Sequence, residues 1–317
     1  MDVITRTFKQ LGHPDRLRIL AALQQGELTV SELTRVLDLS QPRVTQYIGS
    51  LEAAGMIERL REGSWVFVRL TGGTGAVSDI VRAALSGLPS DDATLAADRD
   101  RLADVRRDRA LEAERFFADV ANNQGQLSHD FLPSSTIEDA LLAAAGNGHF
   151  ERMVDLGTGS GRMLQLFGGR VGRGVGIDLS PDMLRVARHQ LAGENGPHLH
   201  VELGDIAATR LPADSADLVT LHHVLHYLDQ PLTALQEAAR LLRPGGRLII
   251  ADFAPHDFDA FRDRFAHRRL GFTPQEMDEL LQRGNLSVGN VTRVATADGP
   301  DVLIWQADKP RTRRSAA

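Results

Sequence analysis

The sequence predicts an α/β protein in which an N-terminal winged helix-turn-helix precedes a C-terminal doubly wound, Rossmann-like sheet. Three observations lead to this fold class. Residues 153–162 carry an apolar strand into a turn with alternating glycines, and residues 174–179 form a second short strand that closes on a carboxylate. Residues 1–70 show helical apolar spacing followed by strand-like alternation. The length of 317 residues is sufficient for two separate cores.

The first predicted helices are defined by signals at their ends. Pro14 opens one helix, because proline suits the first helical position. Thr29 followed by Glu32 is a capping box for the next helix. Ser40 caps a third helix, which we expect over residues 41–54. Apolar residues of this third helix fall on one face, so its opposite, polar face is left for a partner.

A hairpin follows the third helix. Residues 56–60 and 65–70 alternate between apolar and polar, with a polar tip at 61–64. Two helices joined by a tight turn and followed by a β wing form a winged helix-turn-helix, which binds DNA in the major groove. A helical domain used only for dimerisation is the alternative. Arginine and glutamine read base edges and arginines also contact phosphates, so the expected DNA-binding residues are Gln41, Arg43, Thr45, Gln46 and Arg61.

The N-terminal pattern is similar to that of a known repressor family. The resemblance, over about the first 85 residues, is to the ArsR/SmtB repressors and is carried by residues 40–47, 51–57 and 61–70. It implies a homodimer that binds an inverted repeat in double-stranded DNA. Many arsenic sensors of that family have Cys-Val-Cys where this chain has Thr-Val-Ser at 29–31, and the zinc-sensor ligands are missing from 77–88. We therefore expect no metal site, and a ligand sensed by the C-terminal domain.

The connection between the two predicted domains begins with a flexible break at 71–75. A short amphipathic helix at 76–85 corresponds to a helix that completes the dimer interface in the repressors. Residues 91–120 are charged at helical spacing and predict a solvated linker helix, with a partner-binding helix as the alternative. Phe116 and Phe117 either line the ligand site or anchor this helix. The expected domain limits are 1–88 for the DNA-binding and dimerisation domain, 89–120 for the helical linker and 121–310 for the C-terminal domain.

The glycine turn departs from the dinucleotide fingerprint. That fingerprint requires Gly or Ala at position 162, where this chain has Arg162. An oxidoreductase that uses NAD is therefore disfavoured. About twenty residues beyond the turn, Asp178 ends the second strand at the spacing used to hold the ribose of a nucleoside. The turn itself starts after Asp155 and contains Gly157, Gly159 and Gly161.

The C-terminal domain resembles the class I S-adenosylmethionine (SAM) dependent methyltransferases. The glycine turn matches their first motif, and later matches follow in order at 200–206, 216–221 and 241–250. The resemblance implies that the domain binds SAM or its product S-adenosylhomocysteine (SAH). The resemblance implies that Asp155 and the amides of the turn hold the methionine part of SAM. It also implies that Asp178 holds the ribose, and that Asp205 and Ile206 hold the adenine. The implied set is Asp155, Gly157, Gly159, Gly161, Asp178, Leu179, Asp205 and Ile206.

No catalytic base is evident, although histidines follow the fourth and fifth strands. His222, His223 and His256 are the candidates, because imidazole accepts a proton near neutral pH. His222 and His226 also have the i, i+4 spacing of a zinc pair, but no third ligand accompanies them in the sequence. Structural histidines at the start of a helix are the alternative.

Composition narrows the function classes. The chain has no cysteine, which removes disulfides, thiolate metal sites and thiol redox chemistry. No apolar run reaches the roughly 18 residues that a membrane span needs, and the first residues lack the layout of a signal peptide. We therefore expect a cytoplasmic protein without a membrane partner. The net charge of −6 does not exclude nucleic acid, because the first 85 residues are close to neutral.

Two functions from different classes are consistent with these patterns. In the first, the chain is a DNA-binding transcriptional regulator whose methyltransferase domain binds SAM or SAH as effector or substrate. In the second, it is an active SAM-dependent methyltransferase of a small-molecule acceptor, and its DNA-binding domain controls its own operon. The sequence does not name the acceptor or the operator.

Overall fold

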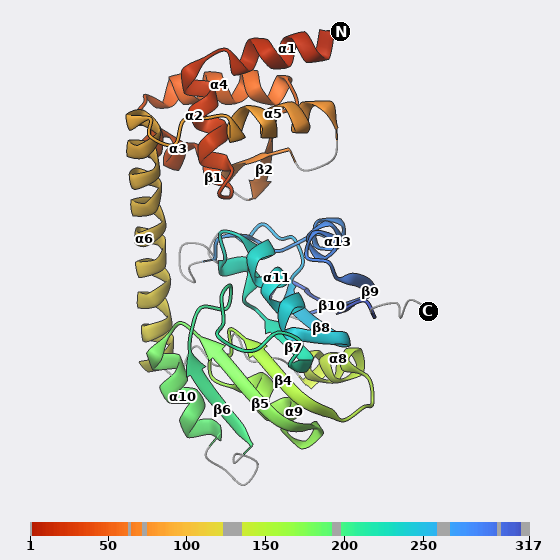
Figure 1. Cartoon of the computed structure of the whole chain (residues 1–317). Helices are drawn as coiled ribbons and strands as arrows, with labels where there is room; N and C mark the ends of the chain where they lie inside the picture. Colours follow the sequence, from red (N-terminus) through yellow and green to blue (C-terminus); the bar gives the residue numbers. More distant parts are fainter. Residues whose placement is uncertain are drawn as a thin grey trace. The chain divides into compact units, whose positions relative to one another are not determined.

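The computed structural model consists of two compact units, Met1–Glu112 and Ala113–Ala317 (Figure 1), and each is described by itself. Within the described residues, no helix is both long enough and apolar enough to cross a membrane. The structure describes residues 2–62, 65–71, 75–122, 135–191, 198–258, 267–296 and 299–311, without the side chains of 2, 61, 62, 65, 110 and 112–122.

The N-terminal unit is a winged helix-turn-helix, as the sequence predicts. Its three-stranded sheet has the order β1-β3-β2, and β3 pairs antiparallel with both neighbours. The elements are α1 (Asp2–Leu11), α2 (Pro14–Leu23), β1 (Leu28–Thr29), α3 (Val30–Leu37), α4 (Gln41–Ala53), β2 (Ile57–Glu62), β3 (Trp65–Leu70), α5 (Ala76–Ser86) and α6 (Ala93–Asn122).

The predicted helix ends are found in the structure with one difference. Thr29 Oγ1 accepts a hydrogen bond from the Glu32 amide at 3.2 Å, and the Glu32 carboxylate accepts one from the Thr29 amide at 2.8 Å, so the capping box is confirmed. Ser40 occupies the N-cap position of α4, but its side chain makes no capping hydrogen bond. The helix therefore starts where predicted without the expected stabilisation.

Helix α1 is an element that the sequence patterns did not indicate. It leaves large apolar side chains on the surface: Val3 and Phe8 are each 59% exposed, and Ile4 is 44% exposed. Its buried contacts within the unit are made mainly with α5 and α2. Because few apolar residues of α1 are buried in the core of its unit, the spacing of its apolar residues does not mark a buried helix face.

The first half of α6 belongs to the core of the N-terminal unit. Leu102 and Val105 are buried in the same cluster as α2, α3 and α4. The Arg18 guanidinium donates to both carboxylate oxygens of the buried Asp98, at 2.7 and 2.8 Å. The prediction of a solvated linker helix is therefore wrong for this half. The exact domain limits 1–88, 89–120 and 121–310 stay a prediction.

The C-terminal unit is built on a seven-stranded sheet of order β6-β5-β4-β7-β8-β10-β9. Strands β4 to β8 run parallel, and β10 is antiparallel to both β8 and β9. The strands are β4 (Phe150–Leu156), β5 (Val171–Asp178), β6 (Leu199–Leu203), β7 (Ala216–His222), β8 (Leu242–Phe253), β9 (Ser287–Val294) and β10 (Val302–Asp308). This order confirms the doubly wound fold. It reverses between β4 and β7, which is where ligands bind in such sheets.

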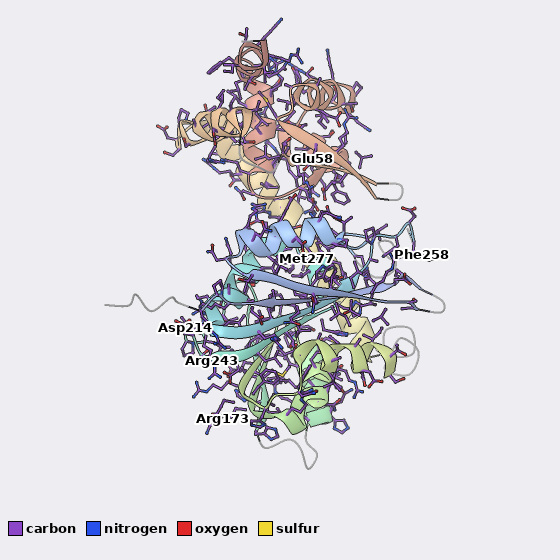
Figure 2. All side chains as sticks on the ribbon, turned by 90° about the vertical axis from the view of Figure 1, so that its right-hand side faces the viewer. Glu58, Arg173, Asp214, Arg243, Phe258 and Met277 are labelled. Carbon is purple, nitrogen blue, oxygen red and sulfur yellow. The ribbon has the colours of Figure 1, made fainter. Side chains whose placement is uncertain are left out.

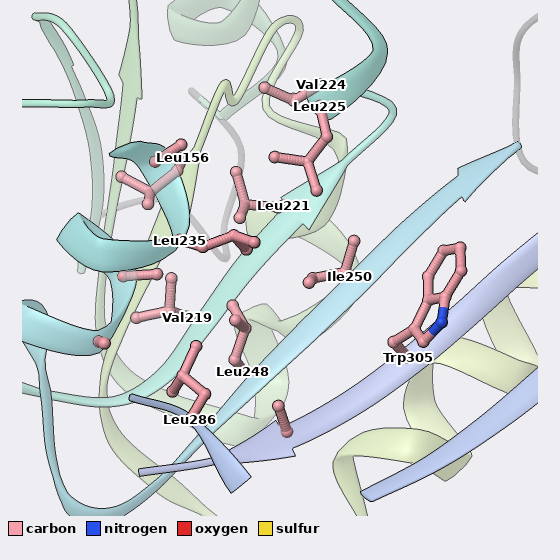
Figure 3. Packing of buried hydrophobic residues seen from close by; sticks show 14 of the residues in the cluster. Leu156, Val219, Leu221, Val224, Leu225, Leu235, Leu248, Ile250, Leu286 and Trp305 are labelled. Atoms are coloured by element: carbon pink, nitrogen blue, oxygen red, sulfur yellow. The ribbon is translucent and has the colours of Figure 1, made fainter. Parts of the chain in front are cut away.

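Helices cover both faces of this sheet. One apolar cluster joins the sheet to α11 and α13, and a second joins it to α8, α9 and α10. In the first cluster Met277 of α13 is fully buried (Figure 2), and Trp305 of β10 lies opposite Ile250 of β8 (Figure 3). The helices are α8 (Ser135–Ala145), α9 (Arg162–Phe167), α10 (Pro181–Leu191), α11 (Pro231–Leu241) and α13 (Pro274–Arg283), with short 3₁₀ turns η1 (Gly168–Arg170) and η2 (Leu225–Tyr227).

Candidate functional site

The glycine turn lies at the carboxyl end of β4. All three of its glycines have positive φ, at +77° for Gly157, +50° for Gly159 and +83° for Gly161. A Cβ on Gly157 would also lie 2.4 Å from a methyl carbon of Val224. Glycine is therefore required there both by the backbone conformation and by the approach of the chain after β7.

Asp178 ties the end of β5 to this turn. Its Oδ2 accepts a hydrogen bond from the Gly159 amide at 2.8 Å, and its Oδ1 accepts one from the Ser180 amide at 2.9 Å. Burial raises the pKa of this carboxyl above its usual value, against the effect of these backbone donors. Each carboxylate oxygen has a second lone pair, so Asp178 retains acceptor capacity for a ligand.

Asp155 is buried beside the turn with half of its carboxylate unpaired. Its Oδ1 accepts a hydrogen bond from the Thr220 hydroxyl at 2.6 Å, whereas its Oδ2 makes no hydrogen bond of normal geometry among the described residues. The nearby Thr158 hydroxyl still favours the ionised form of the carboxyl. Burial raises the pKa of the Asp155 carboxyl to about 6. An unpaired buried carboxylate oxygen is unfavourable by itself, and a cationic or hydrogen-bond-donating ligand would compensate it.

The ends of β5 and β6 present an apolar surface next to Asp178. Leu179 is 65% exposed and Leu203 is 62% exposed, which is unusual for large apolar side chains. Asp205 is exposed and its Oδ1 accepts from the Ala207 amide at 2.8 Å, whereas Ile206 is buried. The residues predicted for adenine thus lie together at one edge of the sheet. Leu203 is an addition that the sequence did not indicate.

The three histidines proposed as bases lie at the carboxyl ends of β7 and β8. The rings of His222 and His223 contact each other edge to face at 4.5 Å, and His223 lies 4.4 Å from the ring of Phe253. The His256 ring lies 5.8 Å from the same phenylalanine. Burial lowers the pKa of His222 well below its usual value and that of His223 to about 4. Both imidazoles are therefore neutral near pH 7.

A buried imidazole–carboxylate pair stands among these histidines. His226 Nδ1 and Asp252 Oδ1 are 2.7 Å apart, and the His226 amide also donates to Asp252 Oδ2 at 3.3 Å. Both side chains are at most 1% exposed. Burial would raise the pKa of Asp252, but the imidazoles of His226 and His223 together with the Phe253 amide hold it below its usual value. The two residues are 26 positions apart in sequence, so only the neighbouring ends of β7 and β8 bring them together.

The polar face of α4 contains most of the residues predicted to bind DNA. Gln41, Thr45 and Gln46 are exposed and line one shallow surface with Pro42. Arg43 is also exposed, but its guanidinium donates to the Tyr47 hydroxyl at 3.0 Å and pairs with Asp15 of α2 at 3.1 Å. Contact with a base would require Arg43 to leave these partners. The side chain of Arg61 lies outside the described residues.

Two further arginines of the wing are held in ion pairs. The Arg59 guanidinium pairs with Glu52 of α4 at 3.0 Å, and the Arg69 guanidinium pairs with Glu58 of β2 at 2.6 Å (Figure 2). Gly49 of α4 faces the same region, since a Cβ there would meet Arg59 at 3.6 Å. Gly49 thus points toward the wing.

Both units match known protein families. Residues 13–59 match the family model described as bacterial regulatory protein, arsR family. Residues 154–250 match the family model described as methyltransferase domain. Over 62 residues the chain is 44% identical to the biofilm growth-associated repressor of Agrobacterium fabrum, covering 20% of this chain and 53% of that protein. Both resemblances drawn from the sequence are confirmed.

Longer matches to this chain are also found. Over 155 residues the chain is 41% identical to a 37.1 kDa protein of transposon Tn4556 from Streptomyces fradiae, covering 47% of this chain and 42% of that protein. The matches therefore span about half the length of these curated relatives. The N-methyltransferase NodS of Bradyrhizobium japonicum WM9, solved in complex with SAH, superposes with a TM-score of 0.52 at 21% identity, covering 64% of this chain and 99% of that one. This likeness shows the fold.

Proposed function

We propose that this chain, which carries an ArsR-type helix-turn-helix and a methyltransferase domain, is a DNA-binding transcriptional regulator whose methyltransferase domain binds SAM and SAH. The observation that carries the proposal is the group of residues at the carboxyl ends of β4 and β5. There a turn of three positive-φ glycines lies between Asp178 and the buried, half-unpaired Asp155. We place the protein in the cytoplasm, where both DNA and SAM are available.

The residues at these strand ends fit the chemical groups of SAM. The Oδ2 of Asp155 suits the α-ammonium of its methionine part. The amides of Gly157, Gly159 and Gly161 already donate to Ile177 O, Asp178 Oδ2 and Thr158 O, so each would have to leave its present acceptor to bind the α-carboxylate. Asp178 has lone pairs available for the ribose hydroxyls. The exposed apolar side chains of Leu179 and Leu203 suit the flat adenine ring, with Asp205 and Ile206 beside them. SAM bound there would supply an electrophilic methyl group at the carboxyl ends of the parallel strands.

In the regulator, α4 and the wing contact an inverted repeat in double-stranded DNA, and two copies of the chain form a homodimer. Exposed Gln41, Thr45 and Gln46 support the assignment of α4 as the reading helix. The apolar surface of α1, with Val3 and Phe8 exposed beside α5, supports pairing with a second copy.

The direct test is calorimetry of the full chain with SAM and with SAH, repeated in the presence of operator DNA. We expect one ligand per chain, and a change in operator affinity of about 5- to 150-fold at ligand saturation, the range of ordinary allosteric coupling. Absence of binding would remove the cofactor assignment. Tight binding with unchanged operator affinity would remove the role of SAM as an effector.

The affinity for SAH should depend on the ionisation of Asp155. Its carboxyl has a pKa of about 6, so it is mostly ionised at pH 7 and mostly neutral at pH 5. Because the neutral form loses its attraction for the α-ammonium, we expect the SAH dissociation constant to rise about tenfold from pH 7 to pH 5. Calorimetry across this range measures it.

Asp155→Asn is the matched variant for this pH effect. It should bind SAH weakly at every pH, with no step near pH 6. Asp139→Asn, at an exposed position on α8, should keep the wild-type profile. A wild-type affinity that is constant between pH 5 and 7 would show that Asp155 does not meet the ammonium.

Gly49→Ala should stabilise the N-terminal unit without harming DNA binding. The new methyl has ordinary contact distance to Arg59, and alanine is favoured over glycine in a helix by about 1 kcal/mol. We expect a rise in Tm of roughly 4 °C or more for that unit by scanning calorimetry. Gly55→Ala, at φ +71°, should instead lower it. Operator affinity reduced tenfold in Gly49→Ala would mean that this backbone touches DNA.

A second function, methylation of a small-molecule acceptor, is favoured by the imidazoles at the ends of β7 and β8. His223 and His256 contact the ring of Phe253, and His222 contacts His223, at the end of the sheet where the methyl group would be presented. Release of SAH from SAM in the presence of an acceptor panel of phenols, amines and thiols tests this function. Tight SAM binding without turnover on the panel would favour the regulator.

A further inference from the structure

Three side chains with metal-ligating atoms converge at the carboxyl ends of β7 and β8. They are His223, which follows β7, His226 in η2, and Asp252 of β8. One ligand atom from each lies within 4.8 Å of the other two. His223 takes a positive φ of 52°, which is uncommon for a residue with a side chain. This turn therefore holds the three groups in one place at some conformational cost.

The cluster leaves buried imidazole nitrogens without partners. Among the described residues, His223 Nδ1 and His226 Nε2 have no hydrogen-bond partner. Asp252 is fully buried. Among the described residues, the one side chain that pairs with it is His226, whose Nδ1 contacts Asp252 Oδ1. Buried polar nitrogens without partners are rare and unfavourable. His223 Nδ1 thus has an unused electron pair for a cation, whereas His226 would bind the cation through Nδ1, the nitrogen that now contacts Asp252 Oδ1.

The donor set matches a particular class of ion. Two imidazoles and one carboxylate are the ligands of zinc and of neighbouring divalent transition metals, whereas magnesium and calcium prefer oxygen alone. An ion bound by both His226 Nδ1 and Asp252 Oδ1 would replace the proton that they share. Their separation of 2.7 Å would then open to about 3.3 Å, the spacing of neighbouring ligands around a tetrahedral zinc.

We propose that His223, His226 and Asp252 bind one divalent transition-metal ion, with Zn²⁺ the best match to the donor set. Three protein ligands leave a fourth position for water or a small ligand, as in catalytic rather than structural zinc sites. The site lies in the C-terminal unit, apart from residues 29–31 and 77–88, where the sequence lacks the ligands of known repressors. It does not depend on the binding of SAM.

Cobalt tests this site with a spectroscopic readout. Metal-free full-length protein, prepared with a chelator and dialysed, is titrated with Co²⁺, whose visible absorption is strong only in tetrahedral or five-coordinate sites. We expect saturation at one Co²⁺ per chain and loss of the signal when Zn²⁺ is added. Titration with no such absorption would overturn the proposal.

Variants locate the bound ion. His223→Gln and His226→Gln should each weaken Co²⁺ binding by at least about tenfold. His200→Gln, at an exposed histidine of β6 whose side chain pairs with Glu202 at 3.2 Å, is the control and should bind as wild type. Near-UV circular dichroism of each variant checks that the unit is folded. A cobalt signal that survives both substitutions in folded protein would place the ion elsewhere and refute the assignment.

Discussion

Phe8→Glu is expected to convert the proposed dimer to a monomer and to weaken operator binding by more than 100-fold. Phe8 is 59% exposed and lies one helical turn from the exposed Ile4, on the same face of α1. A carboxylate placed in the centre of an apolar dimer contact would be buried without a partner. DNA affinity falls because two linked half-site contacts become independent, and linkage contributes about 10²- to 10⁴-fold.

Sedimentation measures the oligomeric state, and a fluorescence titration with an inverted-repeat operator measures the affinity. Lys9→Glu is the control, because Lys9 is an exposed residue about 100° around α1 from Phe8 and the substitution makes a larger change of charge. It should remain dimeric. If Phe8→Glu also remains dimeric at micromolar concentration, α1 does not form the interface.

Asp178→Asn is expected to weaken SAH binding by about 10- to 150-fold, which is the range for losing hydrogen bonds to a charged acceptor. The variant removes the charge at the end of β5 and places an amide where Gly159 and Ser180 now donate their N–H groups. Calorimetry with SAH measures the loss, and Asp139→Asn should bind as wild type.

The ribose contact can be separated from the effect on the turn. The 2′-deoxy analogue of SAH should bind wild-type protein more weakly than SAH does. In Asp178→Asn the two ligands should bind nearly equally, because the acceptor of the hydroxyl hydrogen bond has been changed. An equal preference for SAH in both proteins would mean that Asp178 only shapes the turn.

Much of the fold could be predicted because its signals are local. The glycines of the turn after β4 and the capping box of Thr29 and Glu32 depend on residues within four positions of one another. The helix α6 shows the limit of such signals. Its charged surface dominates the pattern, whereas the burial of Leu102 and Val105 depends on packing against α2 and α3, far away in sequence.

Residues of the candidate site could be predicted only where each one is marked by the end of its own strand. Asp155, Asp178 and Asp205 each follow a recognisable strand, so their grouping at one edge follows from the order of the sheet. The pairing of His226 with Asp252 depends instead on the register of β7 with β8, which places His222 opposite Ala251. Periodicity in sequence does not specify that register. The ion pair between Arg43 and Asp15 was missed because it depends on the packing of α4 against α2.

The burial of Trp305 gives the protein an internal optical probe. The chain has two tryptophans, and one lies in each unit: Trp65 in β3 and Trp305 within the apolar layer next to β8. With Trp305 replaced by phenylalanine, all indole emission comes from the wing of the helix-turn-helix. The spectra of the two proteins together would therefore distinguish the order in which the two halves melt.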